Sequence, residues 1–207
     1  MSIMDRDQAV ALRKLLLDTS AEPGWVAASA EFGLAVQAAP KSAGGLLVAG
    51  PAQAEPWHFT AHLADEALWA QLPFLAPTLL RADPAAGAPA HLSVGWERLT
   101  QAGRGEALLV VAEIDPQEEL LERIDKAKHN GARVLALAQA APELRGLAHE
   151  TLLVPPVRAE SAGPLTFDTA QHLVSLASTA QPGRRGGLRA RLIRWQERTN
   201  GPAVESW

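Results

Sequence analysis

The sequence predicts an α/β fold: a three-layer, doubly wound and mainly parallel sheet of about five strands, with helices on both faces. Three observations predict it. Short apolar runs bounded by glycine or proline alternate with segments of helical periodicity. A strand at 108–112, a helix at 116–130 and a strand at 133–138 make a right-handed unit with parallel strands. The 207 residues, 47% hydrophobic and 20% charged, suffice for one globular domain with a substantial core.

The first half of the chain predicts helices and one well-marked strand. The apolar run 46–49 lies between glycines and is short, which indicates a buried strand. Helical periodicity marks the segments 5–17, 25–36 and 54–72. Between residues 73 and 95 proline, alanine and glycine are frequent, and the strand candidates there are 78–81 and 91–94.

The second half also predicts where one helix begins and ends. For the helix at 116–130, Asp115 is expected to be the amino-terminal cap, Pro116 to occupy the first turn and Gly131 to follow the end. Its inward face is apolar at helical spacing: Leu120, Leu121, Ile124 and Ala127. Two further elements, a strand and a helix, are predicted at 151–154 and 166–179.

Composition and charge exclude several classes of function. The chain has no cysteine, which excludes disulfides, thiolate metal sites and thiol catalysis. Its formal net charge of −4 makes the whole molecule a poor binder of nucleic acid. The chain begins without a signal-like apolar run and contains no stretch of about 18 apolar residues, so we expect a cytoplasmic protein without a membrane span. Neither G-x-G-x-x-G nor a P-loop occurs, so no cofactor is expected.

The central unit carries a recognisable set of motifs. Residues 127–132 read AKHNGA and precede the apolar strand VLALAQ, and Glu122 lies in the helix before them. Upstream GGLLVAGPAQ has the pattern of a strand and a glycine-containing turn, and FDTAQHLVSLAS that of an apolar closing helix. This arrangement resembles the sugar isomerase (SIS) family over about residues 5–179. The resemblance implies a SIS-type sandwich, a homodimer and a sugar phosphate as ligand.

The loop that binds phosphate in the SIS family is altered in this chain. The family pattern Ser-x-Ser-Gly-x-Thr aligns with residues 112–117, AEIDPQ, so both serines are apolar residues, the glycine is Asp115 and the threonine is Gln117. Glu113 and the glutamates at 118 and 119 add negative charge, and one close pair of like charges costs ~1–4 kcal/mol. The sequence therefore predicts that the usual phosphosugar site is lost.

The resemblance still indicates which residues would bind a ligand or act on it. The expected ligand-binding residues are Gly50, Gln53, Glu113, Asp115, Gln117 and Thr166. In an active isomerase, His172 on the late helix and Glu122 would be the catalytic residues. Asp168 lies four residues before His172, so the two could form an acid–base pair or simply stabilise the helix.

His58 and His62 are the candidates for metal ligands. They lie four residues apart on a predicted helix, so their rings share a face, and Asp65 or Glu66 could be a third ligand. Residue 59 is phenylalanine, so the glutamate of the metalloprotease pattern is absent. We expect the ordinary alternative, a solvated or interface face of the helix, and no bound metal.

A basic arm, residues 181–207, is expected to follow a domain of residues 1–180. Between residues 183 and 200 six arginines and one glutamate give a net charge of +5. Such a segment could contact nucleic acid or an anionic surface, or fold back on the acidic body. Three functions follow: a SIS-like binding domain that is non-catalytic or has a divergent ligand, which we favour; an active phosphosugar isomerase; and a regulatory factor that uses the arm.

Overall fold

A single parallel sheet forms the centre of the protein. The computed structural model describes residues 23–155 and 166–180. In this part of the chain the strand order is β2-β1-β3-β4-β5, and every pairing is parallel. The strands are β1 (Leu46–Ala49), β2 (Pro77–Leu79), β3 (Ala107–Ile114), β4 (Arg133–Ala140) and β5 (Glu150–Leu153). The order reverses between β1 and β3, and open sheets of this kind bind ligands at the carboxyl ends of the strands beside such a reversal.

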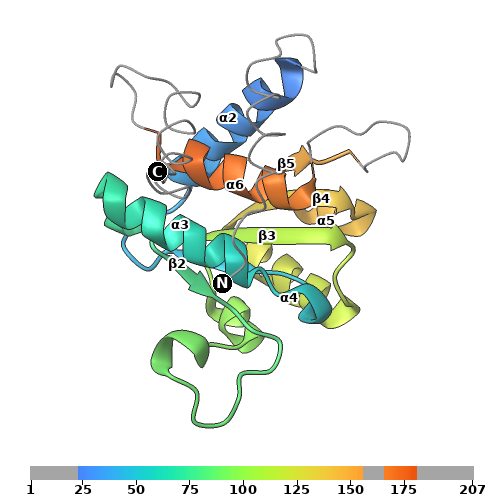
Figure 1. The fold of residues 1–207 in the computed structure, drawn as a ribbon. Helices are drawn as coiled ribbons and strands as arrows, with labels where there is room; N and C mark the ends of the chain where they lie inside the picture. The colour runs from blue at the N-terminus through green and yellow to red at the C-terminus, as the bar shows by residue number, and fades with distance from the viewer. Residues whose placement is uncertain (1–22, 156–165, 181–207) are drawn as a thin grey trace, which may run out of the picture.

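Helices cover both faces of the sheet (Figure 1). One face carries α2 (Pro23–Ala38), α3 (Trp57–Ala70) and α6 (Phe167–Ser178), and the other carries α4 (Glu118–His129) and α5 (Pro142–Leu147). The four 3-10 helices are η1 (Ala52–Ala54), η2 (Pro73–Leu75), η3 (Ala90–Leu92) and η4 (Trp96–Gln101). Leu46 and Val48 of β1 belong to the core under the first set of helices, whereas Leu47 and Ala49 belong to the second core. Burial on both faces explains why the strands are continuous apolar runs.

Most of the predicted elements are confirmed. The strands predicted at 46–49, 108–112, 133–138 and 151–154 are β1, β3, β4 and β5, and the helices predicted at 25–36, 54–72, 116–130 and 166–179 are α2, α3, α4 and α6. The strand predicted at 91–94 is wrong, because the amides of Leu92 and Ser93 bond to the carbonyls of Pro89 and Ala90 within η3 instead of to another strand. Helix α5 is missed, since six residues are too few to show helical periodicity.

One further predicted strand has different bounds in the structure, and two predicted features lie outside the described residues. β2 covers Pro77–Leu79 rather than 78–81, and Arg81 makes a single bridge to Gly95. The helix predicted at 5–17 and the basic arm at 181–207 lie outside the described residues.

The helices α2 and α6 approach each other closely at Gly33. A Cβ at this position would lie 2.3 Å from Cβ of Ala177 and 2.8 Å from the backbone nitrogen of Ser178. Only glycine lets the two helices pack at this separation without displacing one of them. This contact matters for the site because α6 carries several of its side chains.

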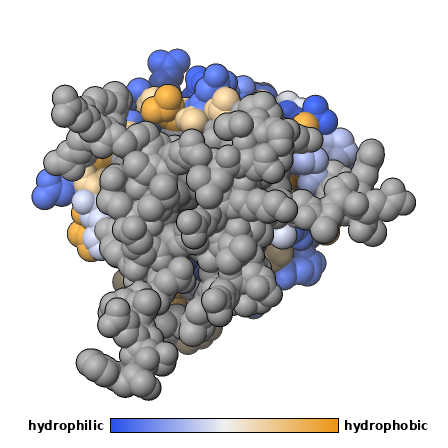
Figure 2. Space-filling view, turned by 45° about the horizontal axis from the view of Figure 1, so that its top comes forward, coloured by the Kyte–Doolittle hydropathy of each residue, from blue (hydrophilic) through white to orange (hydrophobic). Residues whose placement is uncertain are grey.

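Where the described residues can be seen in Figure 2, polar and apolar side chains are mixed. The larger exposed apolar side chains are Leu34, Trp57, Leu68, Trp69, Ile114 and Leu153. Exposed apolar residues of this kind are common on folded domains. None of the helices in the described part of the chain has the length and hydropathy of a transmembrane segment.

Candidate functional site

A cleft of about 250 Å³ opens at the carboxyl ends of β1 and β3, where the strand order reverses. Its lining includes Glu55, His58, Glu113, Phe167 and Gln171, from the segment after β1, the start of α3, the end of β3 and the start of α6. The segment after β1 passes close to β3 at Gly50. A Cβ at this position would lie 2.7 Å from both the carbonyl oxygen of Val111 and Cδ of Pro56, so a larger residue does not fit. The glycine therefore sets the position of one wall.

Gln117 joins the two loops that border the cleft. Its Nε2 donates to Oε1 of Gln53 at 2.7 Å, and its Oε1 accepts from the amide of Ala52 at 3.3 Å. Both glutamine side chains are thus used to hold the loops after β1 and β3 together. The sequence predicts both glutamines as ligand contacts, and in the structure they bond to each other and to the amide of Ala52.

Asp115 caps a different helix from the one predicted. Its two carboxylate oxygens accept from the amides of Glu143 and Leu144, at 3.3 and 3.0 Å, at the start of α5. Helix α4 begins at Glu118, two residues after Pro116, and its cap residue Gln117 makes no side-chain capping bond. The prediction that Asp115 caps the helix after β3 and that Pro116 lies in its first turn is therefore wrong.

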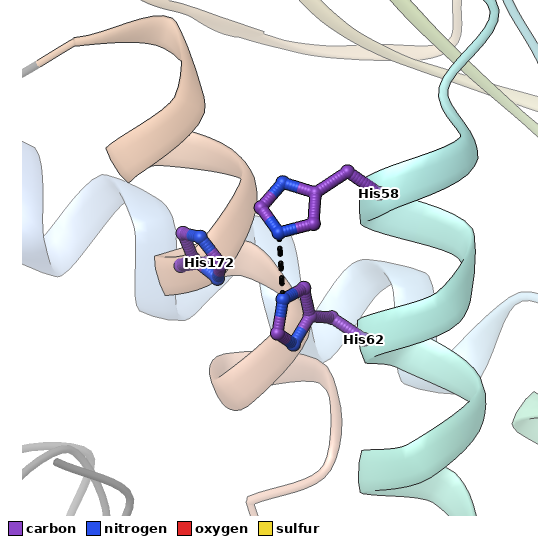
Figure 3. A group of neighbouring side chains, drawn as sticks. All are labelled: His58, His62 and His172. Atoms are coloured by element: carbon purple, nitrogen blue, oxygen red, sulfur yellow. Dashed lines mark hydrogen bonds between the residues drawn. The ribbon is translucent and has the colours of Figure 1, made fainter. Parts of the chain in front are cut away.

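Three histidines meet between α3 and α6 (Figure 3). His58 and His62 lie one turn apart on α3, and His172 of α6 faces them, so that one ring nitrogen from each lies within 4.8 Å of the others. The Nε2 atoms of His58 and His62 are 2.8 Å apart, and the ring centroids of the three pairs are separated by 4.5 to 4.9 Å. His58 is exposed, His62 is half-buried and His172 is buried.

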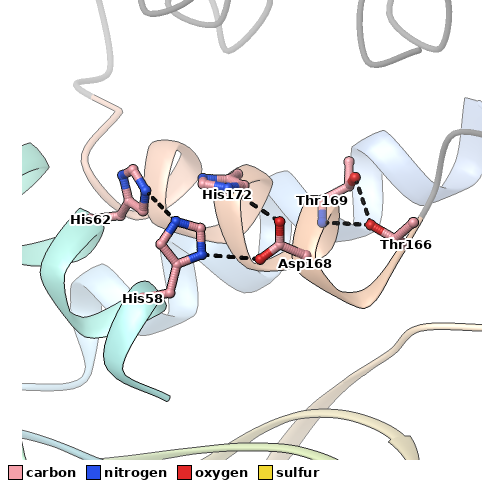
Figure 4. Close-up of polar contacts among 6 residues, drawn as sticks. All are labelled: His58, His62, Thr166, Asp168, Thr169 and His172. Atoms are coloured by element: carbon pink, nitrogen blue, oxygen red, sulfur yellow. Dashed lines mark hydrogen bonds and ion pairs between the residues drawn. The ribbon is translucent and has the colours of Figure 1, made fainter. Parts of the chain in front are cut away.

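One carboxylate connects two of these rings (Figure 4). Oδ1 of Asp168 lies 3.1 Å from Nδ1 of His58, and its Oδ2 lies 3.6 Å from Nε2 of His172. Asp168 is held at the start of α6 by a regular cap, in which Oγ1 of Thr166 accepts from the amide of Thr169 at 3.1 Å. The four side chains form a polar group, the histidine cluster, defined as His58, His62, Asp168 and His172.

The fold of the chain matches solved structures, whereas no family model and no curated protein matches it. A candidate phosphosugar isomerase from Silicibacter pomeroyi DSS-3 aligns with a TM-score of 0.56 and 16% identity, over 96% of this chain and 56% of that one. A candidate sugar-binding protein from Salmonella typhimurium LT2 aligns with a TM-score of 0.53 and 20% identity, over 94% of this chain and 54% of that one. The fold is SIS-like. This chain spans little more than half the length of these two proteins, and identities this low establish the fold alone.

The SIS-like fold separates the two residues predicted to be catalytic. His172 lies on α6 in the layer with α2 and α3, whereas Glu122 is exposed on α4, which packs on the opposite face of the sheet. The structure instead brings His172 together with His58 and His62, a grouping that the sequence does not predict. Thr166, a predicted ligand contact, is the cap of α6.

The surroundings of the histidine cluster alter the acidity of two of its members. Burial, and then the neighbouring rings of His172 and His58, lower the pKa of His62 to about 4. The imidazole of His172, and then that of His58, stabilises the carboxylate of Asp168 and lowers its pKa to about 2. At neutral pH His62 is therefore uncharged and Asp168 is ionised.

These shifts predict that metal-free protein loses stability as the solution becomes acidic. In the unfolded chain His62 takes up a proton near pH 6.5, but in the folded protein only near pH 4, so the loss occurs as pH falls through this window. Asp168 adds a second loss between its unfolded value of 3.8 and about 2. Urea unfolding of the His62→Gln variant, with a chelator present, should show a smaller fall than the natural protein between about pH 7 and about pH 4. His129→Gln, at an exposed position on α4, is the control, and an equal fall in both variants contradicts the prediction.

Proposed function

We propose that this protein is a SIS-like domain that binds an uncharged, carbohydrate-type ligand in the cleft at the ends of β1 and β3. The observation that supports it most is the exposed carboxylate of Glu113, which lines the cleft within the loop where SIS proteins resembling this chain have their phosphate-binding residues. We therefore expect the ligand to bind where SIS proteins bind their sugar phosphate, but to be uncharged.

The charges around the cleft disfavour a phosphate group. A bound phosphate needs free amides, hydroxyl donors or cations at a helix amino terminus. Here Glu113 lines the cleft, and Glu118 and Glu119 occupy the first turn of α4. Gln117 already accepts from an amide of the opposite loop, and Asp115 is bonded to α5. Each close carboxylate–phosphate pair would cost ~1–4 kcal/mol, depending on how well solvent screens it.

The same lining suits the hydroxyl groups and ring of a neutral sugar. Glu113 can accept hydrogen bonds from hydroxyls, and the amide of Gln171 can both donate and accept. The Phe167 ring adds an apolar contact to this polar set. A volume of about 250 Å³ lies just below the roughly 300–1,000 Å³ range of clefts that hold drug-sized ligands, which favours a single sugar unit.

The position of the predicted catalytic residues favours binding over isomerisation. Neither His172 nor Glu122 lines the cleft, and the two lie on opposite faces of the sheet. The homodimer, the cytoplasmic location and a role for the basic arm stay predictions.

Calorimetry with matched ligands tests the proposed function. We expect neutral aldoses, ketoses or N-acetylated amino sugars to include a ligand that binds at least about tenfold more tightly than its own 6-phosphate, and sugar phosphates to bind no tighter than about millimolar. Glu113→Ala should weaken binding of the neutral ligand about ten- to hundredfold, since a hydrogen bond to a charged group is worth about 1.5–3 kcal/mol. Glu118→Ala removes the same charge outside the cleft lining and should leave binding nearly unchanged. Micromolar binding of a sugar phosphate, or equal effects of the two variants, would refute the proposal.

A further inference from the structure

The histidine cluster has the composition of a metal site. The chain contains six histidines, and three of them, the neighbours His58 and His62 on α3 and the distant His172 on α6, place a ring nitrogen within 4.8 Å of one another. We propose that His58, His62 and His172 bind one Zn²⁺ ion, with Asp168 as the carboxylate that orients two of the ligands. His58 also lines the cleft, but the proposal rests on the three histidines and not on the ligand proposed there.

The helices α3 and α6 place the three histidine side chains around one point. His58 and His62 are four residues apart on α3 and so share a face, and α6 brings the third ring from the opposite side (Figure 3). Zn–N bonds of about 2.0–2.1 Å in a tetrahedral site require nitrogens about 3.3 Å apart. The observed spacings, 2.8 Å between His58 and His62 and at most 4.8 Å overall, bracket that value. The three nitrogens thus lie near the separation that one ion requires, and we expect small rotations of the side chains to close the difference.

Asp168 completes the pattern around the ligands. Histidines that bind metals commonly donate their second ring nitrogen to a carboxylate, which fixes the tautomer and makes the ring a stronger ligand. Nδ1 of His58 lies 3.1 Å from Oδ1 of Asp168, so its Nε2 is directed toward His62, where the metal would lie. The other oxygen of Asp168 lies 3.6 Å from His172. The carboxylate also offsets part of the charge of a divalent cation.

The donor set selects the kind of metal. Three imidazoles, with no thiolate available in a chain without cysteine, suit Zn²⁺ and similar borderline ions rather than Mg²⁺ or Ca²⁺. Three protein ligands leave a fourth coordination position for water or a small molecule, the arrangement typical of zinc sites that act on or hold a ligand.

The competing explanation is that the rings pack and hydrogen-bond between two helices without a metal. Edge-on contacts occur among all three rings, and His58 bonds to His62. This explanation predicts that added zinc has no specific effect. The two explanations therefore differ in the expected affinity for zinc, which can be measured without any sugar.

Zinc binding by the untagged, full-length protein decides between them. After treatment with a chelator and dialysis, titration with ZnCl₂ is followed by calorimetry and by thermal unfolding. We expect one ion per chain with a dissociation constant in the micromolar range or tighter, and a rise in melting temperature that follows the zinc concentration. Co²⁺ in place of zinc should give the visible absorption of a four-coordinate ion.

Matched variants assign the site. His58→Ala and His62→Ala, and His172→Gln, which keeps most of the buried volume, should each weaken zinc binding at least tenfold. Asp168→Asn should weaken it about ten- to hundredfold while keeping one ion per chain. The control is His129→Ala, since His129 pairs with Asp125 on α4 at the same four-residue spacing and should bind zinc as the natural protein does.

Two results would overturn the proposal. One is the absence of any melting shift or bound ion at micromolar zinc. The other is unchanged affinity in His58→Ala, an exposed position where the fold should survive, which would mean that the zinc binds elsewhere. Circular dichroism of each variant establishes that the loss of binding is not a loss of folding.

Discussion

Replacing Gly33 by valine is expected to destabilise the protein by more than about 3 kcal/mol, or to prevent folding, because three atoms would be added where even one does not fit. A Cβ at this position lies 2.3 Å from Cβ of Ala177 and 2.7 Å from its backbone carbonyl carbon. A clash with backbone cannot be relieved by a change of rotamer, so α2 and α6 must separate. Both helices carry core residues, including Phe32, Val36 and Leu173, so separation also loosens the packing under them.

Gly33→Ala should produce a smaller loss, about 1–3 kcal/mol, although alanine favours helix formation by about 1 kcal/mol. Gly146→Ala is the matched control, since it lies in α5 with nothing within 4 Å of the added methyl group. Urea unfolding monitored by circular dichroism measures all three variants. If Gly33→Ala were as stable as Gly146→Ala, the close approach of α2 and α6 would not constrain the fold. Because His172 and Asp168 lie on α6, the destabilised variants should also lose zinc affinity.

The central part of the fold could be predicted because burial leaves a clear signal in the sequence. β3 and β4 are covered on both faces and are therefore continuous apolar runs, and α4 between them is apolar only on the side of Leu120, Ile124 and Ala127. Where an element is short, proline-rich or held by distant contacts, the sequence carries no apolar pattern that predicts it. η3 is stabilised by local turns, and the start of α5 by the remote carboxylate of Asp115. Neither element leaves a periodic pattern in the sequence.

The site could be predicted only in part, for the same reason. The four-residue spacing of His58 and His62 indicated a shared helix face, but the third histidine, His172, comes from α6 and reaches them only once α3 and α6 pack on the same face. The sequence predicts Asp115 as the cap of the nearest helix, α4, because short-range capping is the usual arrangement. Its partners in α5 become its neighbours only when the sheet has formed. Contacts between residues that are far apart in sequence can be predicted only when the topology of the fold is known.

Glu55 shows how a residue without any motif can hold the site in place. Its Oε2 accepts from Nε of Arg81 at 3.0 Å and from Nε1 of Trp57 at 2.9 Å, and its Oε1 accepts from the amide of Ala82 at 2.9 Å. The Arg81 guanidinium also lies over the Trp57 ring, 4.6 Å from its centroid. The carboxylate thereby ties the start of α3 to the chain that follows β2. His58 follows Trp57 directly, so these contacts also position His58. This residue both lines the cleft and belongs to the histidine cluster.

Glu55→Ala is expected to cost about 2–4 kcal/mol, because it leaves a partly buried guanidinium and a backbone amide without their acceptor. The carboxylate is only 9% exposed, whereas Glu119 in the pair with Arg123 is 62% exposed. Glu119→Ala, the matched control for a glutamate–arginine pair, should therefore cost less than about 1 kcal/mol. The double variant Glu55→Ala with Arg81→Ala should recover part of the loss, since the unpaired charge is removed with its partner. Equal costs for Glu55→Ala and Glu119→Ala in urea unfolding would show that the start of α3 is held by packing alone. If instead Glu55→Ala is costly and also weakens zinc binding, the position of His58 depends on this carboxylate.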